Sequence, residues 1–219
     1  MNNLRKASKL FLPLIMLLFF VSACATVPRH PVTFIDDAEE RDRIVEYAES
    51  LLGKKDLETL GSGFRSDCSG YIVGVYRTLG YRLSLEPQPG DRSVAQSLFW
   101  TLQKRNLIYS SRRPKKADLV FFKGTTEKRR YHISHVGLVA SVDEDGTVLV
   151  LQYSSKGVSE LRMNLRRPDA HKGKIGRIIN DFLKRGSGDR LSGQLFFSYG
   201  DLLVHAKHER HAKAASISM

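Results

Sequence analysis

Hydrophobic and polar residues follow three successive patterns along the chain, and the first is an apolar leader. A basic start is followed by an apolar run from Leu10 to Val21 that only Pro13 interrupts. A charged start, a short apolar run and a small-residue site are together typical of a secretory signal, and this run is too short for a membrane-spanning helix. We therefore predict a signal peptide over residues 1–23 and a tether without periodic structure over residues 24–36.

The second pattern places apolar residues at helical spacing and predicts three helices. Acidic residues in the first turn and a glycine after the last apolar position frame the first helix. Asp67, a residue type that favours the N-cap, precedes the second helix, in which Cys68 shares an apolar face with Ile72 and Val75. The Cys68 thiol is therefore expected at a helix N-terminus, on the side that packs inward. The predicted helices cover residues 37–52, 68–79 and 91–104.

The third pattern consists of short apolar runs rich in β-branched and aromatic residues, which predict strands. The turn signal from Asp143 to Gly146 separates the last two runs and predicts a hairpin. Further along, residues 175–184 indicate a late helix, and an apolar pattern resumes over 195–203. Helices followed by antiparallel strands predict an α+β domain. The predicted strands cover residues 118–122, 135–140 and 148–153.

The length of 219 residues fits one domain or a small pair of domains. We predict a main domain over residues 37–165, a C-terminal extension over 166–204 that packs on it, and a disordered basic tail over 205–219. The composition, with 42% hydrophobic and 26% charged residues, is that of a globular protein. It excludes wholesale disorder and a multi-span membrane protein.

An excess of Lys and Arg gives the chain a formal charge of +12, and the basic runs 112–116 and 128–130 contribute to it. Such runs usually form a solvated surface, but these could also line a cleft for carboxylate substrates or contact anionic lipid headgroups. The secretion signal and the lack of a recognition motif argue against nucleic acid as a partner. No Cys/His set has zinc-site spacing, and the regularly spaced His205, His208 and His211 fit a solvated tail, so we expect no metal and no cofactor.

The chain contains two cysteines, and the first follows the leader. Val21-Ser22-Ala23-Cys24 resembles the bacterial lipobox, whose cysteine becomes acylated, and acylation of Cys24 would anchor the protein to a membrane. The alternative is an ordinary cleaved signal. Ala25 stands where an inner-membrane retention signal usually has Asp, which by analogy favours the outer membrane, facing the periplasm. Cys68 would then be a lone thiol in an oxidising compartment, which favours a chemical role.

Cys68 occupies a favourable position for a nucleophile. A helix N-terminus can lower a cysteine pKa from about 8.5 toward roughly 3.5–7.5. The N–H groups of the first turn can receive a developing oxyanion, which makes Asp67 and Ser69 candidate oxyanion- or substrate-binding residues. Gly70 would keep this turn open for a substrate. The alternative is that Cys68 is a small core residue of an amphipathic helix.

The base must come from another part of the chain, and His135 at the start of an apolar strand is the first candidate. Across the hairpin of residues 143–146, Gln152 comes close to the position opposite His135. Its carbonyl could accept the Nδ1–H of His135 and orient the ring, which is the third role in a catalytic triad. His132, in a polar loop three residues earlier, is the rival base.

Four motifs follow one another along the chain: Asp67-Cys-Ser-Gly70 at a helix start, Arg92-Ser-Val-Ala-Gln96, Ala117-Asp-Leu-Val-Phe-Phe122, and His135-Val-Gly137 on a strand. In this order they resemble the motifs of the NlpC-type cell-wall peptidases, over roughly residues 41–160. The related cysteine- and histidine-dependent amidohydrolases, the CHAP group, share the same plan. The resemblance implies a papain-like α+β fold in which the nucleophile helix packs on an antiparallel sheet.

The resemblance also implies an activity, the hydrolysis of amide bonds in peptidoglycan peptides by a membrane-anchored cysteine hydrolase. By position, Cys68 is the nucleophile, His135 the base and Gln152 the third polar residue, whereas Asp118 has a structural role. The chain departs from the family at Gln152, where most relatives have His, and upstream of Cys68, where a tyrosine is absent. The alternatives are an inactive lipid-anchored scaffold or cell-wall binding domain and a papain-like acyltransferase. The oligomeric state stays open.

Overall fold

The computed structural model describes residues 37–61, 64–86, 93–126, 132–184 and 188–217. From Ile35 onward the chain forms one compact unit. The predicted signal peptide, Cys24, the tether and the basic run 128–130 lie outside the described residues. None of the helices in the described part has both the length and the apolar character needed to cross a membrane.

Three helices precede the main strands, as the sequence predicts. They are α1 (Asp37–Glu49), α2 (Cys68–Thr78) and α3 (Val94–Lys104), and a short 3-10 turn, η1 (Glu58–Leu60), lies between the first two. The apolar residues of each helix face the interior, which includes the fully buried Ile44, Ile72 and Leu98. Helical spacing of apolar residues therefore gave the correct helices, each within about three residues of its observed ends.

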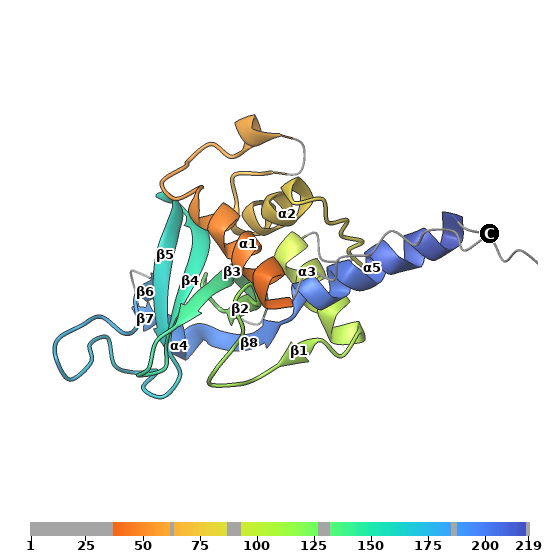
Figure 1. Cartoon of the computed structure of the whole chain (residues 1–219). Coiled ribbons are helices and arrows are strands. Elements are labelled where there is room, and N and C mark those ends of the chain that lie inside the picture. The colour runs from red at the N-terminus through yellow and green to blue at the C-terminus, as the bar shows by residue number, and fades with distance from the viewer. Residues whose placement is uncertain (1–36, 62–63, 87–92, 127–131, 185–187, 218–219) are drawn as a thin grey trace, which may run out of the picture. The chain divides into compact units, whose positions relative to one another are not determined.

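The core of the unit is an antiparallel six-stranded sheet with the strand order β1-β8-β2-β3-β4-β5 (Figure 1). The β3–β4 hairpin closes at the turn Asp143–Gly146, and Gly146 has a φ of 83°, which glycine adopts easily. The strands are β1 (Ile108–Tyr109), β2 (Leu119–Lys123), β3 (Ile133–Val142), β4 (Thr147–Ser154), β5 (Gly157–Asn164) and β8 (Phe196–Gly200).

Both faces of this sheet are covered. On one face, α1, α2 and α3 pack over residues such as Phe121, Leu138 and Leu151. On the other face a second apolar cluster, with Val150 and Met163, is covered by the segment that follows β5. That segment contains β6 (Phe182–Lys184), β7 (Arg190–Leu191) and the short helix α4 (Ser192–Leu195). The predicted α+β fold, with the helix that begins at Cys68 packed on an antiparallel sheet, is confirmed.

Two predictions for the C-terminal third are wrong. Residues 175–184 do not form a helix, because Gly173 N–H donates to the Arg177 carbonyl at 2.7 Å and closes a tight hairpin instead. Residues 166–204 are not an extension packed on a finished domain, because β8 pairs with both β1 and β2 inside the main sheet. The domain therefore does not end near residue 165.

The predicted disordered tail is also largely helical. Helix α5 spans Leu202–Ile217, and His205, placed in the tail by its charged neighbours, is fully buried. Lys207 pairs with Asp37 and, at 2.5 Å, with Glu40, which joins α5 to the first turn of α1. The basic composition of this segment concealed the apolar face that packs into the core.

A buried ion cluster, formed by Arg41, Asp118 and Asp201, joins three distant parts of the chain. The guanidinium of Arg41 on α1 donates to Asp118 Oδ1 at 2.9 Å and to Asp201 Oδ2 at 2.6 Å. Asp118 directly precedes β2, and Asp201 directly precedes α5. The structural role predicted for Asp118 thus consists of holding α1 and the C-terminal helix at the start of the central strand.

Candidate active site

Cys68 is the first residue of α2, and Asp67 caps the helix. Asp67 Oδ1 accepts hydrogen bonds from the backbone N–H of Ser69 at 3.0 Å and of Gly70 at 2.7 Å. Burial raises the pKa of Asp67, but these bonds and the nearby Arg65 guanidinium outweigh it and lower the pKa overall. The cap therefore fixes a negative charge beside the thiol and holds the start of the helix in place.

This cap changes the roles expected for Ser69 and Gly70. The Ser69 N–H is already bonded, its hydroxyl donates to Asp67 Oδ1 at 2.6 Å, and its side chain is buried, so Ser69 is not available to an oxyanion. A Cβ on Gly70 would lie 2.5 Å from the Arg65 carbonyl oxygen, so this glycine permits close approach of the preceding chain rather than of a substrate. Cys68 precedes Ser69 and Gly70, and its backbone N–H at the helix start is not one of the two that the Asp67 side chain binds.

His135 and Gln152 come together on neighbouring strands. His135 Nε2 and Gln152 Oε1 are 2.6 Å apart, which fits an N–H donated by the ring to the amide carbonyl. The sequence predicts this partnership through Nδ1, whereas the structure uses Nε2. In the register of the two strands, Leu138 pairs with Leu151, which places Gln152 opposite Gly137 and diagonal to His135.

Gly137 makes this diagonal contact accessible. A Cβ at this position would lie 2.5 Å from a methyl carbon of Val150 and 3.7 Å from Cβ of Gln152. Any larger residue would therefore disturb the strand beside the pair. The space required beside His135 and Gln152 therefore explains the glycine of the His135-Val-Gly137 motif.

Cys68 and His135 line the same cavity, and each residue shifts the pKa of the other. Burial raises the pKa of Cys68, but the charge and hydrogen bond of His135, and a bond from the backbone N–H of Val136, lower it overall. Burial lowers the pKa of His135, yet the coupling to Cys68 and the bond to Gln152 raise it overall. Both shifts favour a thiolate–imidazolium pair, and the Gln152 bond at Nε2 leaves Nδ1 to face the sulfur.

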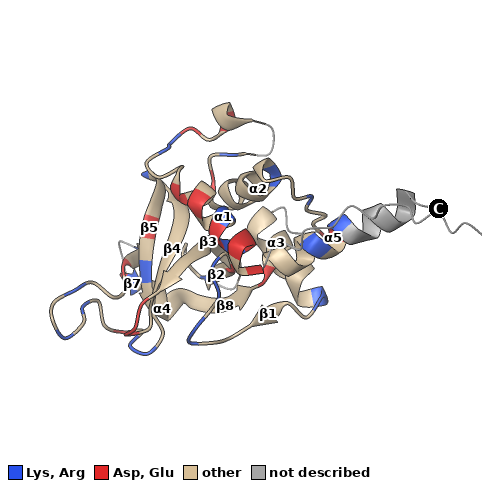
Figure 2. Cartoon of the chain, viewed as in Figure 1, with Lys and Arg blue, Asp and Glu red and all other residues tan. Residues whose placement is uncertain are grey.

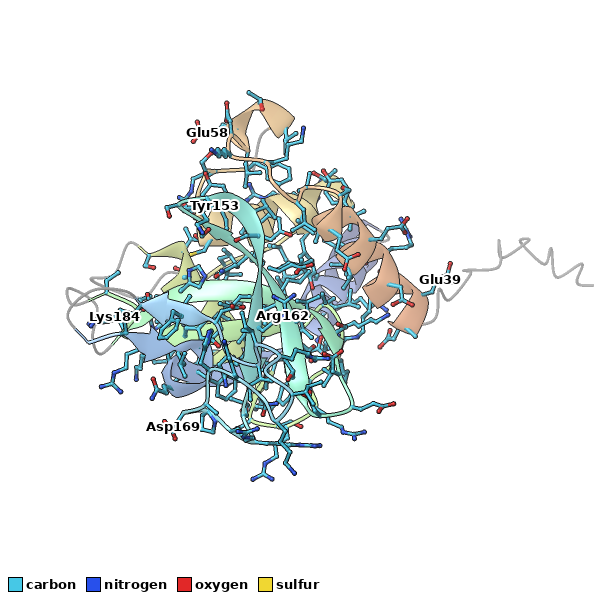
Figure 3. The ribbon with its side chains drawn as sticks, turned by 90° about the vertical axis from the view of Figure 1, so that its left-hand side faces the viewer. Glu39, Glu58, Tyr153, Arg162, Asp169 and Lys184 are labelled. Atoms are coloured by element: carbon cyan, nitrogen blue, oxygen red, sulfur yellow. The ribbon has the colours of Figure 1, made fainter. Side chains whose placement is uncertain are left out.

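A cavity of about 700 Å³ opens at this pair. Asp67, Cys68, His135 and Gln152 form one wall of it. Its other lining residues come from the loop after β2, from the β4–β5 turn and from the start of β6; they include Thr125, Thr126, Tyr153, Ser154, Lys156, Ser159, Glu160, Asp181 and Phe182. Figure 3 shows Tyr153 and Lys184 on the side of the molecule that carries these elements.

The rival base His132 and the basic run 112–116 do not line this cavity. Among the described lining residues His135 is the only histidine, and His132 is exposed in the bend before β3. Within the run 112–116, Lys116 pairs with Asp42 at 2.6 Å and Lys115 with Asp201 at 3.4 Å, so the run lies against α1 and the ion cluster. In the described part of the chain, no group of His, Cys, Asp and Glu residues is placed to hold a metal ion.

Sequence reasoning missed the second wall of the cavity. Ser159, Glu160 and Asp181 lie on β5 or just before β6, and neither strand was predicted. Tyr153, whose hydroxyl donates to the Lys55 carbonyl at 2.5 Å, ties the β4–β5 hairpin to the loop ahead of η1. In the sequence, the only indication that Tyr153 lies at the site was its position directly after Gln152 at the end of a predicted strand.

Comparison with known proteins gives one family match. Residues 59–154, which contain Cys68, His135 and Gln152, match the model of the CHAP domain. The matched group is thus the CHAP group of papain-like hydrolases, whereas an NlpC-type specificity stays a prediction. No curated protein matches the chain.

One solved structure similar to the chain is that of an N-acetylmuramoyl-L-alanine amidase from Staphylococcus aureus. The two share 22% sequence identity, and the TM-score is 0.33. The match covers 50% of this chain and 34% of the amidase chain, so this chain spans about a third of that protein.

Proposed function

We propose that this protein is a cysteine-dependent hydrolase of amide bonds in peptidoglycan peptides. The observation that carries the proposal is that Cys68, His135 and Gln152 meet at the wall of one open cavity, where His135 Nε2 lies 2.6 Å from Gln152 Oε1. A nucleophile, a base and a residue that orients the base are the three parts that thiol hydrolysis requires. The match of residues 59–154 to the CHAP domain supports the same class of reaction.

The reaction follows from the positions of these groups. The Cys68 thiolate attacks the amide carbonyl carbon, and the C–N bond breaks as the His135 imidazolium gives its proton to the leaving amine. Water, deprotonated by the neutral imidazole, then cleaves the thioester and restores the thiol and the imidazole. Gln152 keeps the ring oriented through both steps, because its carbonyl accepts the Nε2–H at 2.6 Å.

The oxyanion of each tetrahedral intermediate needs donors near the sulfur. Because Asp67 occupies the N–H groups of Ser69 and Gly70, the N–H of Cys68 is the donor of this turn that faces the reacting carbonyl. The positive end of the α2 dipole acts in the same direction. The loop from Lys54 to Arg65 contains no tyrosine that could serve as a second donor.

The protein is proposed to work at a membrane. A signal peptide over residues 1–23 and acylation of Cys24 would anchor it, and Ala25 favours the outer membrane, with the domain in the periplasm where peptidoglycan lies. Cell fractionation tests this part. Wild-type protein should enter the detergent-extracted membrane fraction with a lipid mass at its N-terminus, and Cys24→Ala should not; lipid-free wild type in the periplasm contradicts it.

The central experiment exposes purified peptidoglycan to the protein and identifies the released fragments by mass. New amine and carboxyl termini within the peptides should appear with wild type and be absent with Cys68→Ala. Fragments that carry a transferred acyl group instead would indicate an acyltransferase. Binding to peptidoglycan without any fragment, together with an unreactive Cys68 thiol, would indicate a scaffold and contradict the proposal.

A further inference from the structure

A basic loop, residues 166–178, follows β5 at one end of the sheet. In Figure 1 it projects beside the β3–β4 turn, and Figure 2 shows cationic positions along it. Five of its residues are Arg or Lys, and Asp169 is the only carboxylate in it. The carboxylate is turned aside, because Asp169 Oδ1 accepts a hydrogen bond from Gln194 Nε2 at 2.9 Å.

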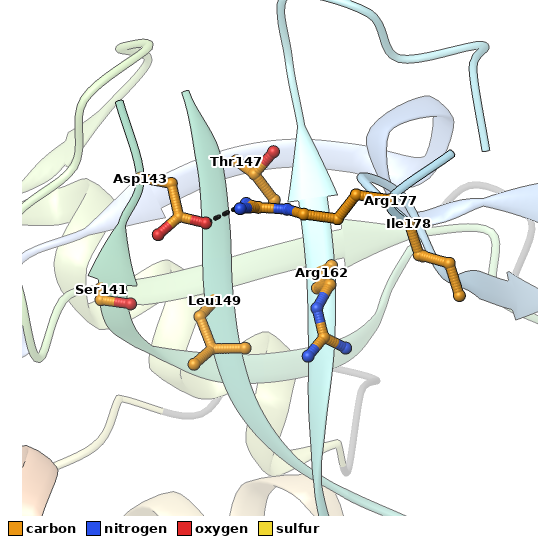
Figure 4. A pocket seen from close by; sticks show the side chains of 7 residues that line it. All are labelled: Ser141, Asp143, Thr147, Leu149, Arg162, Arg177 and Ile178. Atoms are coloured by element: carbon orange, nitrogen blue, oxygen red, sulfur yellow. Dashed lines mark hydrogen bonds and ion pairs between the residues drawn. The ribbon is translucent and has the colours of Figure 1, made fainter. Parts of the chain in front are cut away.

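The base of this loop is firmly held. The side-chain amide of Asn180 donates to the carbonyls of Arg167 at 2.9 Å and Ala170 at 2.7 Å. His171 Nδ1 lies 2.6 Å from the Asn180 carbonyl oxygen, and its ring packs against Phe182. Figure 4 shows Arg177 reaching to Asp143 in the β3–β4 turn, where the two side chains form an ion pair. The loop is therefore a fixed projection from the domain.

The tip of the loop is equally defined, and it presents an apolar side chain to solvent. Lys172 and Ile178 form a β-bridge, and the Gly176 N–H donates to the Gly173 carbonyl at 3.1 Å. Ile175 sits in the turn that these bonds close and is 90% exposed, the highest value among the exposed large hydrophobic residues of the described chain. A single exposed isoleucine is common on protein surfaces and does not by itself indicate a binding site. The residues around Ile175 must therefore be considered with it.

Those neighbours are unpaired cations. No described carboxylate forms an ion pair with Arg167, Lys172 or Lys174, and all three side chains are exposed. An apolar tip surrounded by Lys and Arg is the pattern by which peripheral proteins insert into the headgroup region of anionic membranes. An anionic polymer would match the cations alone, whereas the projecting Ile175 fits a partner with an apolar interior.

The position of the loop suits such a contact. Strand β4 runs from Thr147, near the loop, to Gln152 and Tyr153 at the cavity, which is a span of roughly 17–20 Å. Figure 3 likewise places Asp169, in the loop, at the end of the molecule opposite Tyr153. A membrane held by the loop would therefore leave the cavity directed away from the lipid.

We propose that the basic loop docks on an anionic lipid surface, with Ile175 inserted among the headgroups and Arg167, Lys172 and Lys174 at the phosphates. The contact is independent of the hydrolase activity and of any acylation of Cys24. It orients the domain so that the cavity faces away from the bilayer that the loop contacts.

The test measures co-sedimentation of the full chain with vesicles of phosphatidylcholine alone and with added phosphatidylglycerol. Wild type should bind the anionic vesicles more tightly, and Lys172→Glu/Lys174→Glu should weaken that binding at least about 25-fold, at roughly fivefold per cation. Ile175→Ser should weaken it roughly tenfold through lost apolar burial, and Ile175→Trp should strengthen it. All variants retain residues 1–36, so any contribution of the leader is constant.

A matched control separates the loop from net charge. Lys54→Glu/Lys55→Glu makes the same charge change at exposed positions near the β4–β5 turn, at the other end of the sheet. It should change binding far less than the loop pair. The proposal is overturned if the control weakens binding as much as the loop pair, or if Ile175→Ser binds the anionic vesicles as wild type does.

Discussion

Two buried polar clusters lie at opposite ends of β2, and they differ in whether an open cavity adjoins them. In the ion cluster, Arg41 donates to Asp118, to Asp201 and, at 2.7 Å, to the Lys116 carbonyl. Asp118 also accepts from the Tyr109 hydroxyl and from the Lys115 N–H. Each of these polar groups has a partner, so the cluster links α1 to the starts of β2 and α5.

The pair of Cys68 and His135 is different because its charges can appear and disappear. The pKa of Cys68 is lowered and that of His135 is raised, and both residues line the 700 Å³ cavity. The comparison shows how one sheet separates two uses of buried polarity. A cluster in which every polar group has a partner links elements of the fold. A pair that can exchange a proton beside an open cavity can support catalysis.

The largest effect should come from removing the reactive pair. Cys68→Ala and His135→Ala should each lower turnover by a factor on the order of 10⁴ or more, because the two groups act as a unit. The double variant should be little worse than either single one, and folding should be unaffected. Peptide release from peptidoglycan measures this. His132→Ala is the matched control and should stay active; a dead His132→Ala beside an active His135→Ala would reassign the base.

Breaking the ion cluster should cost stability and not chemistry. Arg41→Met leaves two buried carboxylates without their cation, and we expect a loss of about 3–5 kcal/mol in the free energy of unfolding. Burial already raises the pKa of Asp118 in the presence of Arg41, so the variant should regain part of the loss at lower pH, where that carboxyl is protonated. Urea titration at two pH values measures both effects. An unchanged midpoint would show that the cluster does not link the three elements.

Gln152 lies between the two cases, since it touches the reactive pair without taking part in bond formation. Gln152→Ala should lower kcat about 10- to 100-fold with little change in KM, as losses of orienting partners often do. Gln152→His, the residue more usual in the family, should keep or raise activity. Steady-state kinetics with both variants gives the comparison. A dead Gln152→Ala would mean that the amide contacts substrate or the oxyanion.

The charge state of Cys68 can be followed directly through pH. Because the pKa of Cys68 is lowered, the thiolate should persist at pH values where an ordinary cysteine is protonated, and iodoacetamide reaction should show an apparent pKa below that of an ordinary cysteine. The rate should fall as the pH drops through that value. His135→Ala should move the titration upward by removing the imidazolium. Titration of wild type near or above 8.5 favours an inert core thiol.

The smallest effect on stability is expected from removing the exposed ion pair of Lys116 and Asp42. Lys116 and Asp42 join the same two segments as Arg41 and Asp118, but both side chains are more than half exposed. Lys116→Met should therefore change the free energy of unfolding by at most about 0.5–1 kcal/mol, and added salt should erase the difference. Thermal melts at low and high salt check this. A loss as large as that of Arg41→Met would remove the distinction between buried and exposed pairs.

Much of the fold and site could be predicted where one pattern dominated locally. Helices α1 to α3 and strands β2 to β4 have clear apolar periodicity, and Cys68, His135 and Gln152 were placed by a helix start and a hairpin turn. The predicted nitrogen was wrong, because the spacing of residues does not specify which edge of the His135 ring meets Gln152. A bulge in β3 between Val139 and Ser141 also shifts the register, so that Gln152 lies diagonal to His135. Bulges leave no reliable trace in apolar spacing.

The failures have a common cause in residues whose burial depends on distant partners. In β5, Val158 faces the helix-side cluster and Leu161 the opposite one, so no alternation marks the strand. Residues 175–184 carry apolar residues at helical spacing, but Gly173 and Gly176 close a turn and Ile175 stays outside. Helix α5 was hidden by charges such as Lys207, whose partners Asp37 and Glu40 lie at the other end of the chain.

The place of β8 between β1 and β2 governs the order in which the protein can fold. Leu119 pairs with Leu138 nearby in the chain and with Gly200 far along it, so the long-range pairing forms late and slows folding. Until then β2 exposes an unpaired edge, which is a template for aggregation. A chain cut before Phe196 would contain Cys68, His135 and Gln152 but not β8, so we expect such a chain to aggregate through the open edge of β2 rather than fold.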